Sequence, residues 1–597
     1  MQKSESLFLE QYQRELLYLK ESGKQFAQDH PKVAKRLDWD GNETRDPHVE
    51  RLIESFAFLT AKLQRNISDR FPILSNALLS TLYPQFINPI PSLSMAQFSI
   101  EKSKASPGYH VPKGTGFTVS SKESIQCKFQ TCFDIKLWPI KIESAEIFPT
   151  NALPSIIPGE LSPYTLKLTL KSTGVSFEDM SKLDSLPIYL QGDIGLVSRL
   201  YDALFLGIGR IFAEDSKGKI HHILPPNALK SMGFSRDEIA LPQKAEIHPS
   251  YIFMQEYFAF PEKFLYMNLT SLNLKGFGDE FSLYIPLNET IAEYENSIST
   301  ENFGINCVPI INLFQKTTEP IKIDQHSTQY LLTGDFKKEK TTEIHSIESL
   351  SALLSGENER RELPAYFSFD FETSLKKNTI YWFATRQKIR HKNLPGTEMV
   401  LNFVDFNFRP ELPATDVIWG QALCTNRFAA EQIQAGTKLY PDNPIPSSRI
   451  HVLYAPTPQF IPAETGQAQW NLIAQLSSNQ LSLLNVQRLK HILKLYIPKF
   501  KNNALKEIDS ILEINHVPSV RRVGPSAWRG FVHGIDITIT LDEQMFSSSS
   551  IVLFGEVLYH VFGLSVNMNS FITLKLQNNQ NKVIKTWGPL CGYKPLL

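Results

Sequence analysis

The hydrophobic period of this chain changes near residue 92, and that change limits the folds the chain can adopt. Before residue 92, apolar side chains recur every three or four residues, as on amphipathic helices. After it, they alternate with polar ones, as in Leu166, Leu168 and Leu170, which is typical of strands. We therefore predict an α+β protein: an N-terminal helical unit, then β-rich, loop-rich domains, and a C-terminal α+β domain.

Three helices are predicted within the first 92 residues. One face of the first helix carries Phe8, Tyr12, Leu16 and Leu19. The second is expected to begin at Pro47 with Asp46 as its N-cap, because proline loses no hydrogen bond at the first helical position. The apolar stripe of this second helix comprises Val49, Leu52, Ile53, Phe56, Leu59 and Leu63. A third helix is expected over residues 72–83, and it must end before Pro84.

The length of 597 residues exceeds what one hydrophobic core usually organises, so several domains are expected. We predict a helical domain over residues 1–92 and a β-rich middle domain over 93–335. The polar stretch 336–362 is predicted to be a linker or exposed insertion. A C-terminal α+β domain is expected over 363–597, with a strand at Ile535, Ile537 and Ile539.

Charge and cysteine content narrow the classes of function. Sixty-one basic residues balance sixty-one acidic ones, so no net field attracts nucleic acid or an anionic membrane. Five cysteines are too few, and of the wrong parity, for a disulfide framework in a chain of this length. Neither a signal peptide nor a transmembrane segment is evident. We expect a cytoplasmic protein whose partners are other proteins.

Patterns that would carry chemistry are weak. Cys127 and Cys132 have no second ligand pair nearby in the sequence, so a zinc site is not predicted. Cys424 has no activating neighbour, and a buried structural thiol is favoured over a nucleophile. Asp542 and Glu543 are adjacent at the end of a predicted strand, which favours a solvated, capping strand end over a paired-carboxylate site. We predict no catalytic, metal-binding or cofactor-binding residues.

Aromatic and proline clusters recur along the chain, and they resemble the motifs of one family. The N-terminal clusters are Tyr12, Arg14, Glu15, Leu16, Tyr18 and Leu19, then Asp46, Pro47, Val49, Glu50, Arg51, Leu52, Ile53, Glu54, Phe56 and Phe58, then Tyr83, Pro84, Pro89 and Pro91. The middle clusters are Gly233, Phe234, Asp237, Glu238, Leu241 and Pro242, then Tyr251, Gln255, Glu256, Tyr257, Phe260, Pro261, Lys263 and Phe264, then Cys307, Pro309 and Asn312. The C-terminal clusters are Cys424, Thr425, Asn426 and Arg427, then Trp470, Leu472, Ser477 and Asn479, then Asp542, Glu543 and Phe546, and finally Asn569, Ser570 and Phe571.

In this order the clusters resemble TssF (ImpG/VasA), a subunit of the type VI secretion baseplate. Ser55 stands where the family pattern has glycine, and Asn471 where it has arginine. The alternative for each cluster is core packing, because such side chains bury large areas whatever the function.

The resemblance implies a structural wedge subunit and not an enzyme. Such proteins assemble with TssG, TssK and TssE, with two TssF copies per TssG. Their baseplate contacts the sheath, the tube hub and the membrane complex, and it lies at the inner face of the envelope. The resemblance implies no cofactor, small-molecule substrate, nucleic acid or direct membrane insertion.

The partner-binding candidates are apolar residues of the first two predicted helices: Leu16, Leu19, Val49, Leu52, Ile53, Phe56, Leu59 and Leu63. Three short helices have little core of their own, so we expect them to join a bundle with neighbouring subunits. Packing inward against the β-rich region is the competing interpretation. Two other functional classes stay open: a β-rich cytosolic hydrolase or carbohydrate-active enzyme whose site is assembled from distant residues, and an adhesin-like binding module.

Overall fold

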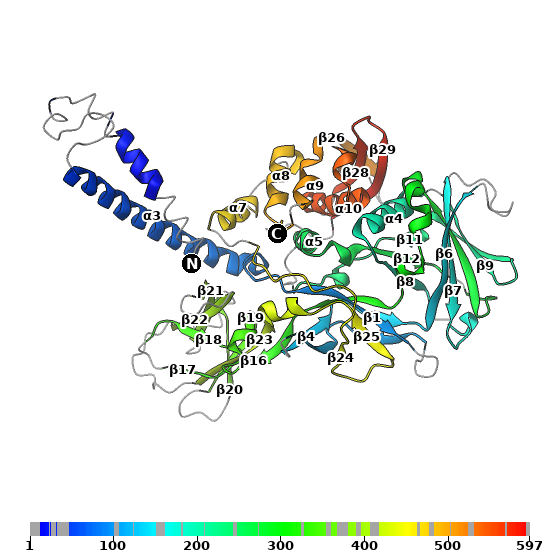
Figure 1. The fold of residues 1–597 in the computed structure, drawn as a ribbon, viewed down its shortest axis with the longest axis horizontal. Helices are drawn as coiled ribbons and strands as arrows, with labels where there is room; N and C mark the ends of the chain where they lie inside the picture. Colours follow the sequence, from blue (N-terminus) through cyan, green and yellow to red (C-terminus); the bar gives the residue numbers. More distant parts are fainter. Residues whose placement is uncertain are drawn as a thin grey trace. The chain divides into compact units, whose positions relative to one another are not determined.

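A computed structural model gives the fold (Figure 1). It describes residues 12–22, 24, 32, 47–100, 107–122, 125–150, 162–180, 183–207, 209–242, 248–272, 274–323, 327–353, 360–366, 380–389, 396–405, 417–462, 466–476, 483–498, 500–501, 503–522, 531–566 and 570–592. The chain divides into two compact units. Residues 1–82 with 463–474 form the first unit, and the remaining residues form the second. The α+β prediction is confirmed, while the predicted domain boundaries stay predictions.

The first unit is helical. It contains a helix over residues 12–22, the 36-residue helix α3 (Pro47–Leu82) and α7 (Gly466–Leu476). The start of α3 at Pro47 agrees with the sequence prediction, while Phe8 and Asp46 lie outside the described residues. The prediction of separate second and third helices was wrong, because α3 continues through Pro72 to Leu82. Proline removes one helical hydrogen bond at an interior position, and here it does not end the helix.

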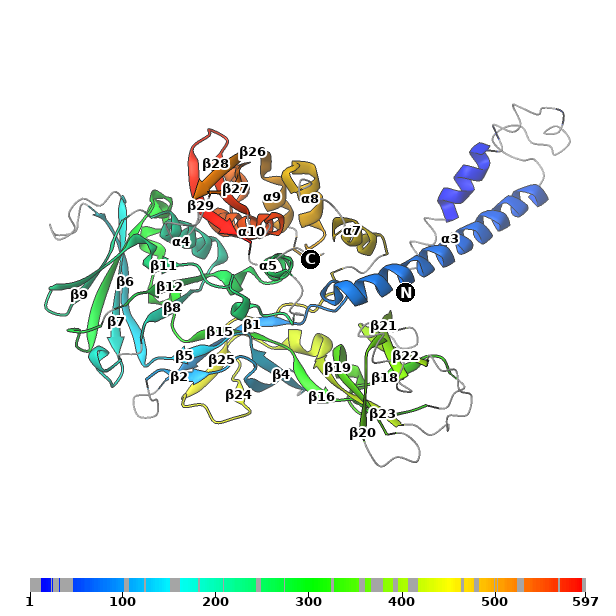
Figure 2. The same cartoon turned by 180° about the vertical axis from the view of Figure 1, so that it is seen from behind.

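The second unit is built mainly from antiparallel sheets (Figure 2). A six-stranded sheet has the order β24 (Tyr440–Pro441), β3 (Gly116–Ser120), β4 (Gln126–Thr131), β15 (Cys307–Ile311), β1 (Leu93–Ser99) and β25 (Arg449–Val452). A small ribbon pairs β2 (Tyr109–Val111) with β5 (Ile135–Leu137). Because the six-stranded sheet combines strands from residues 93 to 452, the middle of this unit cannot form from one continuous segment.

Two further sheets come from residues 140–304. The five-stranded one has the order β10 (Ile220–Leu224), β9 (Ile211–Asp215), β13 (Glu280–Leu287), β7 (Tyr164–Ser172) and β6 (Ile140–Pro149). The four-stranded one has the order β11 (Leu229–Lys230), β12 (Tyr266–Thr270), β8 (Ser185–Leu190) and β14 (Phe303–Gly304). The predicted strand at Leu166, Leu168 and Leu170 is β7, and all three side chains are fully buried.

Residues 314–425 contribute two sheets with a shared apolar core. The first comprises β16 (Phe314–Thr317), β17 (Ile321–Lys322), β23 (Val417–Thr425), β19 (Glu343–Leu353) and β20 (Arg360–Leu363). The second comprises β18 (Tyr330–Leu332), β22 (Thr397–Asp405) and β21 (Ile380–Lys388). Leu350 and Leu401, from different sheets, are both fully buried in this core. Strand β19 lies within the stretch 336–362, for which a linker or exposed insertion was expected.

The C-terminal part combines a four-stranded sheet with helices. Its strands are β26 (Ile511–Arg522), β27 (Phe531–Leu541), β28 (Ser570–Asn578) and β29 (Val583–Cys591), in that order. The helices are α8 (Val486–Lys494), α9 (Asn503–Asp509) and α10 (Ile551–Phe562). Helix α10 packs against α4 (Ile194–Leu206) and α5 (Pro249–Ala259).

A buried carboxylate lies at the beginning of α10. Asp202 of α4 accepts hydrogen bonds from the Ser550 hydroxyl at 2.5 Å and from the Val552 amide at 3.1 Å. Burial raises the pKa of Asp202 to about 6. A carboxylate at a helix N-terminus satisfies amide groups that have no partner within the helix. This contact joins segments 350 residues apart into one core.

Candidate interaction surface

Four apolar side chains of α3 lie exposed in one row. Leu52, Phe56, Leu59 and Leu63 are 68%, 62%, 55% and 61% exposed. Their successive separations of four, three and four residues place them along one face of the helix. We call these four residues the α3 stripe. Apolar residues exposed singly are ordinary, but a contiguous row of large ones is typical of a surface that another protein covers.

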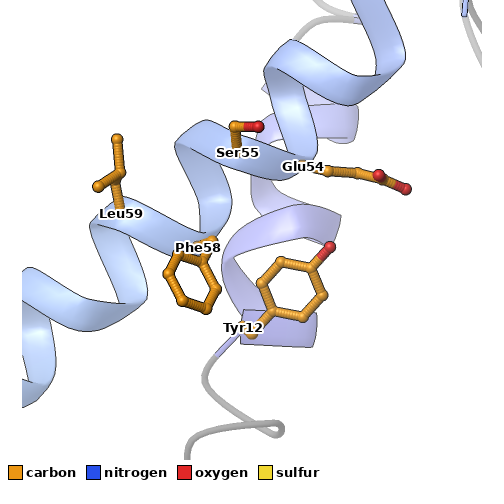
Figure 3. Close-up of a pocket in the computed structure, with 5 residues that line it drawn as sticks. All are labelled: Tyr12, Glu54, Ser55, Phe58 and Leu59. Carbon is orange, nitrogen blue, oxygen red and sulfur yellow. The ribbon is translucent and has the colours of Figure 1, made fainter.

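A different part of α3 faces the helix over residues 12–22. Lys20 Nζ lies 3.5 Å from Glu50 Oε1, which connects the two helices. A groove of about 320 Å³ is lined by Tyr12, Glu54, Ser55, Phe58 and Leu59. Figure 3 shows the ring of Tyr12 beside that of Phe58, with Leu59 pointing away from both. The short helix therefore contacts α3, and Leu59 is the one stripe residue among the described lining of the groove.

The C-terminal third of α3 meets α7 through a buried polar contact. The Ser75 hydroxyl donates to Oε1 of Gln469 over 2.7 Å, and both side chains are buried. A buried hydrogen bond fixes the register of two helices more specifically than apolar contact does. The end of α3 is thus held within the first unit.

The predicted partner-binding residues fall into two groups. Those of the α3 stripe lie together and exposed, while Leu16, Leu19 and Ile53 are half-buried. The side chain of Val49 is outside the described part of the structure. The prediction omitted Leu17 and Tyr18, which are 63% and 65% exposed. Their position between Leu16 and Leu19 could have indicated their exposure, because residues adjacent in a helix face different directions.

The middle motif segments meet in the core instead of at a surface. The Lys263 ammonium forms an ion pair with Glu256 Oε2, and their side chains are 1% and 0% exposed. Glu256 Oε1 accepts hydrogen bonds from the amides of Ala240 and Leu241 at 2.7 and 2.9 Å. Lys263 also donates to the carbonyl of Gly233 at 3.1 Å. Core packing, the alternative weighed for these residues, is what the structure shows.

The motif at residues 424–427 also belongs to a buried network. Asn426 and Asn312 bond to each other twice, at 2.7 and 2.9 Å. Arg427 and Arg386 lie on either side of Glu343, each 3.9 Å from its carboxylate. Arg386 further donates to Asn88 Oδ1 at 3.1 Å. Two guanidinium groups thus share one buried carboxylate, which joins β19 to β21 and to the turn that begins at Arg427.

Side chains that could carry chemistry have structural roles. Cys424 is fully buried, and burial raises the pKa of its thiol to about 12, so it is protonated at neutral pH and a poor nucleophile. The Asp542 carboxylate accepts from the amide of Gln544 and caps a short 3₁₀ turn, as predicted. Within the described ranges, no group of three or more His, Cys, Asp or Glu side chains could hold a metal ion.

A second hollow lies in the second unit, beside β1 and β6. It encloses about 460 Å³ between Phe98, Trp138, Phe303 and neighbouring residues. Glu301 is the one carboxylate among its described lining residues. Glycoside hydrolysis generally uses a pair of carboxylates, so this lining does not match that chemistry.

None of the helices in the described residues is both long enough and apolar enough to span a membrane.

Comparisons with known proteins give matches that cover almost the whole chain. Residues 4–594 match the sequence profile of the family described as "Type VI secretion system, TssF". The type VI secretion system component TssF1 of Pseudomonas aeruginosa is 26% identical over 620 residues, which cover 99% of each protein.

Two solved structures have a similar fold. A chain of a TssK-TssF-TssG baseplate subcomplex, determined by cryo-electron microscopy, gives a TM-score of 0.73 at 22% identity, covering 92% of this chain and 99% of that one. A chain of a type VI secretion baseplate complex gives 0.60 at 21% identity, covering 98% and 100%. The match of the family profile to nearly every residue shows that this chain belongs to the TssF family of the type VI secretion system.

Proposed function

We propose that this chain is a structural wedge subunit of the type VI baseplate and that the α3 stripe packs against helices of neighbouring subunits. Family membership supports the assembly role, and the row of exposed leucines and phenylalanine on α3 supports the place of contact. A role in assembly requires stable interfaces and no turnover, which fits the structural roles of the buried thiols and carboxylates.

The related complexes support two of the proposed partners. TssK and TssG are named together with TssF in the subcomplex of similar fold, and we propose both as partners of this chain. TssE, a second copy of this chain, the sheath, the tube hub and the membrane complex complete the proposed set. The proposed location is the cytoplasm, at the inner face of the envelope.

The geometry of the α3 stripe favours a helical partner. Separations of four, three and four residues follow the alternation by which one helix packs into another. The helix is about 54 Å long at 1.5 Å per residue, so it offers room for more than one partner helix.

Hydrogen exchange of the full chain, alone and bound to TssG, tests this proposal. Amides of residues 49–63 should exchange more slowly in the complex, because partner helices would exclude water and suppress local opening. Equal protection in both states would contradict the bundle.

Substitution of the stripe gives a second test. Phe56→Asp or Leu63→Asp should reduce co-purification with TssG at least about ten-fold, because a buried charge in an apolar contact is costly. Phe336→Asp is the matched control, since Phe336 is 66% exposed but lies elsewhere. Undiminished co-purification by both stripe variants would overturn the assignment of the surface.

The hydrolase alternative has a direct test of its own. Turnover of a glycoside or ester by the purified chain, abolished by substitution of Glu301 in the second hollow, would establish it. We expect no hydrolysis above the uncatalysed rate in buffer.

A further inference from the structure

Helix α10 covers part of one face of the C-terminal sheet. A side chain added at Gly555 of α10 would lie 2.3 Å from Leu576 and 2.5 Å from Trp587, so the helix lies directly on these strands. Beneath it, Ile537 and Ile539 of β27 are 1% and 0% exposed. This is the ordinary packing of a helix on an apolar sheet face.

The same face continues outward along β26 and β27, where its side chains become exposed. Val520 pairs with His533, and Pro518 pairs with Ile535. Because opposite residues of an antiparallel pair share a face and every second residue returns to it, Val520, Phe531 and Ile535 continue the row of Ile537 and Ile539. Phe531 is 78% exposed and Val520 is 51% exposed. We call Pro518, Val520, Phe531 and Ile535 the hairpin face.

The rim of the hairpin face carries basic side chains. His516, His533 and Arg522 lie on it by register, and none of its described residues on β26 and β27 is a carboxylate. Asp536 lies on the opposite face, where it bonds to Arg521 at 2.8 Å. The apolar row is therefore bordered by a guanidinium and two imidazoles. A second copy presenting the same face would place basic groups opposite each other, which is unfavourable.

The free edge of β26 is a poor template for an added strand. β26 is the outer strand of its sheet, and Pro518 lies in the middle of its exposed half. Proline has no N–H to donate to another strand, and such residues on edge strands oppose pairing between sheets. A partner is thus expected on the face of the hairpin and not along its edge.

We propose that the hairpin face docks an acidic amphipathic helix of a partner protein, placed beside α10 on the same side of the sheet. Its apolar residues would cover Val520 and Phe531, and its carboxylates would meet Arg522 and the two imidazoles. The row from His516 to Arg522 is about 20 Å long at about 3.3 Å per residue, which matches a helix of about 13 residues. This surface shares no residue with the α3 stripe.

Two designed peptides test the proposal with the full-length chain. Both have about 14 residues and the same leucine stripe, and their remaining positions are glutamate in one and lysine in the other. Fluorescence anisotropy should show the glutamate peptide binding at least about ten-fold more tightly, because the rim is basic. Equal affinity for the two peptides would overturn the proposal.

Variants locate the binding. Phe531→Asp should weaken binding of the glutamate peptide at least about ten-fold, and Arg522→Glu should remove the preference over the lysine peptide. Val583→Asp is the matched control, because Val583 is 46% exposed on β29 of the same sheet. Unchanged thermal unfolding of each variant confirms that the fold is intact, as expected for exposed positions.

The remaining outcomes distinguish peptide docking on the hairpin face from self-association and from binding to the α3 stripe. Binding undiminished in Phe531→Asp would overturn the proposal. So would self-association in sedimentation that Phe531→Asp abolishes, because a second copy would then occupy the face. Phe56→Asp in the α3 stripe should leave peptide binding unchanged, so failure of the proposed baseplate role and failure of this site give different results.

Discussion

The α3 stripe and the Glu256–Lys263 cluster resemble each other in sequence but differ in structure. Both combine large apolar residues with charged ones. In the Glu256–Lys263 cluster, the two charged side chains pair with each other inside the core, and Glu256 also accepts a backbone hydrogen bond. In α3, Arg51, Glu54 and Lys62 stay exposed alongside the apolar row. What distinguishes a core motif from an interface motif is therefore whether its polar groups find buried partners within the same chain.

Breaking the buried Glu256–Lys263 ion pair should cause the largest loss of stability. Lys263→Met leaves the Glu256 carboxylate buried without its cation, which should cost about 3–5 kcal/mol in the free energy of unfolding. Denaturant unfolding measures this loss. The double variant Glu256→Gln with Lys263→Met should be less destabilised than the single one, because it removes both charges. A single variant as stable as the parent chain would show that the pair does not hold this core.

Acid should weaken a second buried cluster. Burial, with a further contribution from Arg386, lowers the pKa of His345 to about 3. The unfolded chain takes up this proton near pH 6.5, so stability from neutral His345 is complete above that pH and declines as pH falls toward 3. Between pH 6 and pH 4 the loss should be roughly 2–3 kcal/mol, at about 1.4 kcal/mol per pH unit. His345→Gln should flatten this decline, and an unchanged slope would contradict the assignment.

A smaller effect is expected where α3 meets α7. Ser75→Ala removes the hydrogen bond to Gln469 and should cost about 1 kcal/mol. Faster hydrogen exchange in α7 would report it. Ser55→Ala is the matched control, since the exposed Ser55 hydroxyl donates to the carbonyl of Arg51 within its own helix. Equal effects of the two substitutions would argue against a special role for Ser75.

The smallest change in stability is expected on the stripe itself. Phe56→Asp should alter the free energy of unfolding of the isolated chain by no more than about 0.5 kcal/mol, because Phe56 is mostly exposed. The same variant is expected to lose its partner. Large destabilisation of the isolated chain would indicate that Phe56 packs in a core. The α3 stripe would then not differ from the Glu256–Lys263 cluster in the way described.

Elements with a local pattern could be predicted from the sequence. The alternation in β7 and β27 and the start of α3 at Pro47 follow from period and capping chemistry. The continuity of α3 through Pro72 does not, because the cost of one lost hydrogen bond competes with the sum of many helical contacts on both sides of the proline.

Strand β19 shows the other limit of sequence reasoning. The charged residues near both ends of the stretch 336–362 favoured a solvent-exposed segment, yet Glu343 and His345 within it are 2% and 5% exposed. The groups that satisfy them, among them Arg386 and Thr397, are 41 and 54 residues away, so no local pattern indicates their burial. Likewise, exposure of the α3 stripe could not be inferred from period, because the same spacing describes a buried helix face.

The hydrogen bond between Ser75 and Gln469 joins positions 394 residues apart. During synthesis at roughly 5–20 residues per second, α3 leaves the ribosome roughly 20–80 s before α7 exists. For that interval the first helices of the chain must persist without the segment that closes their unit. A protein that binds nascent chains can therefore reach the α3 stripe before α7 has been made.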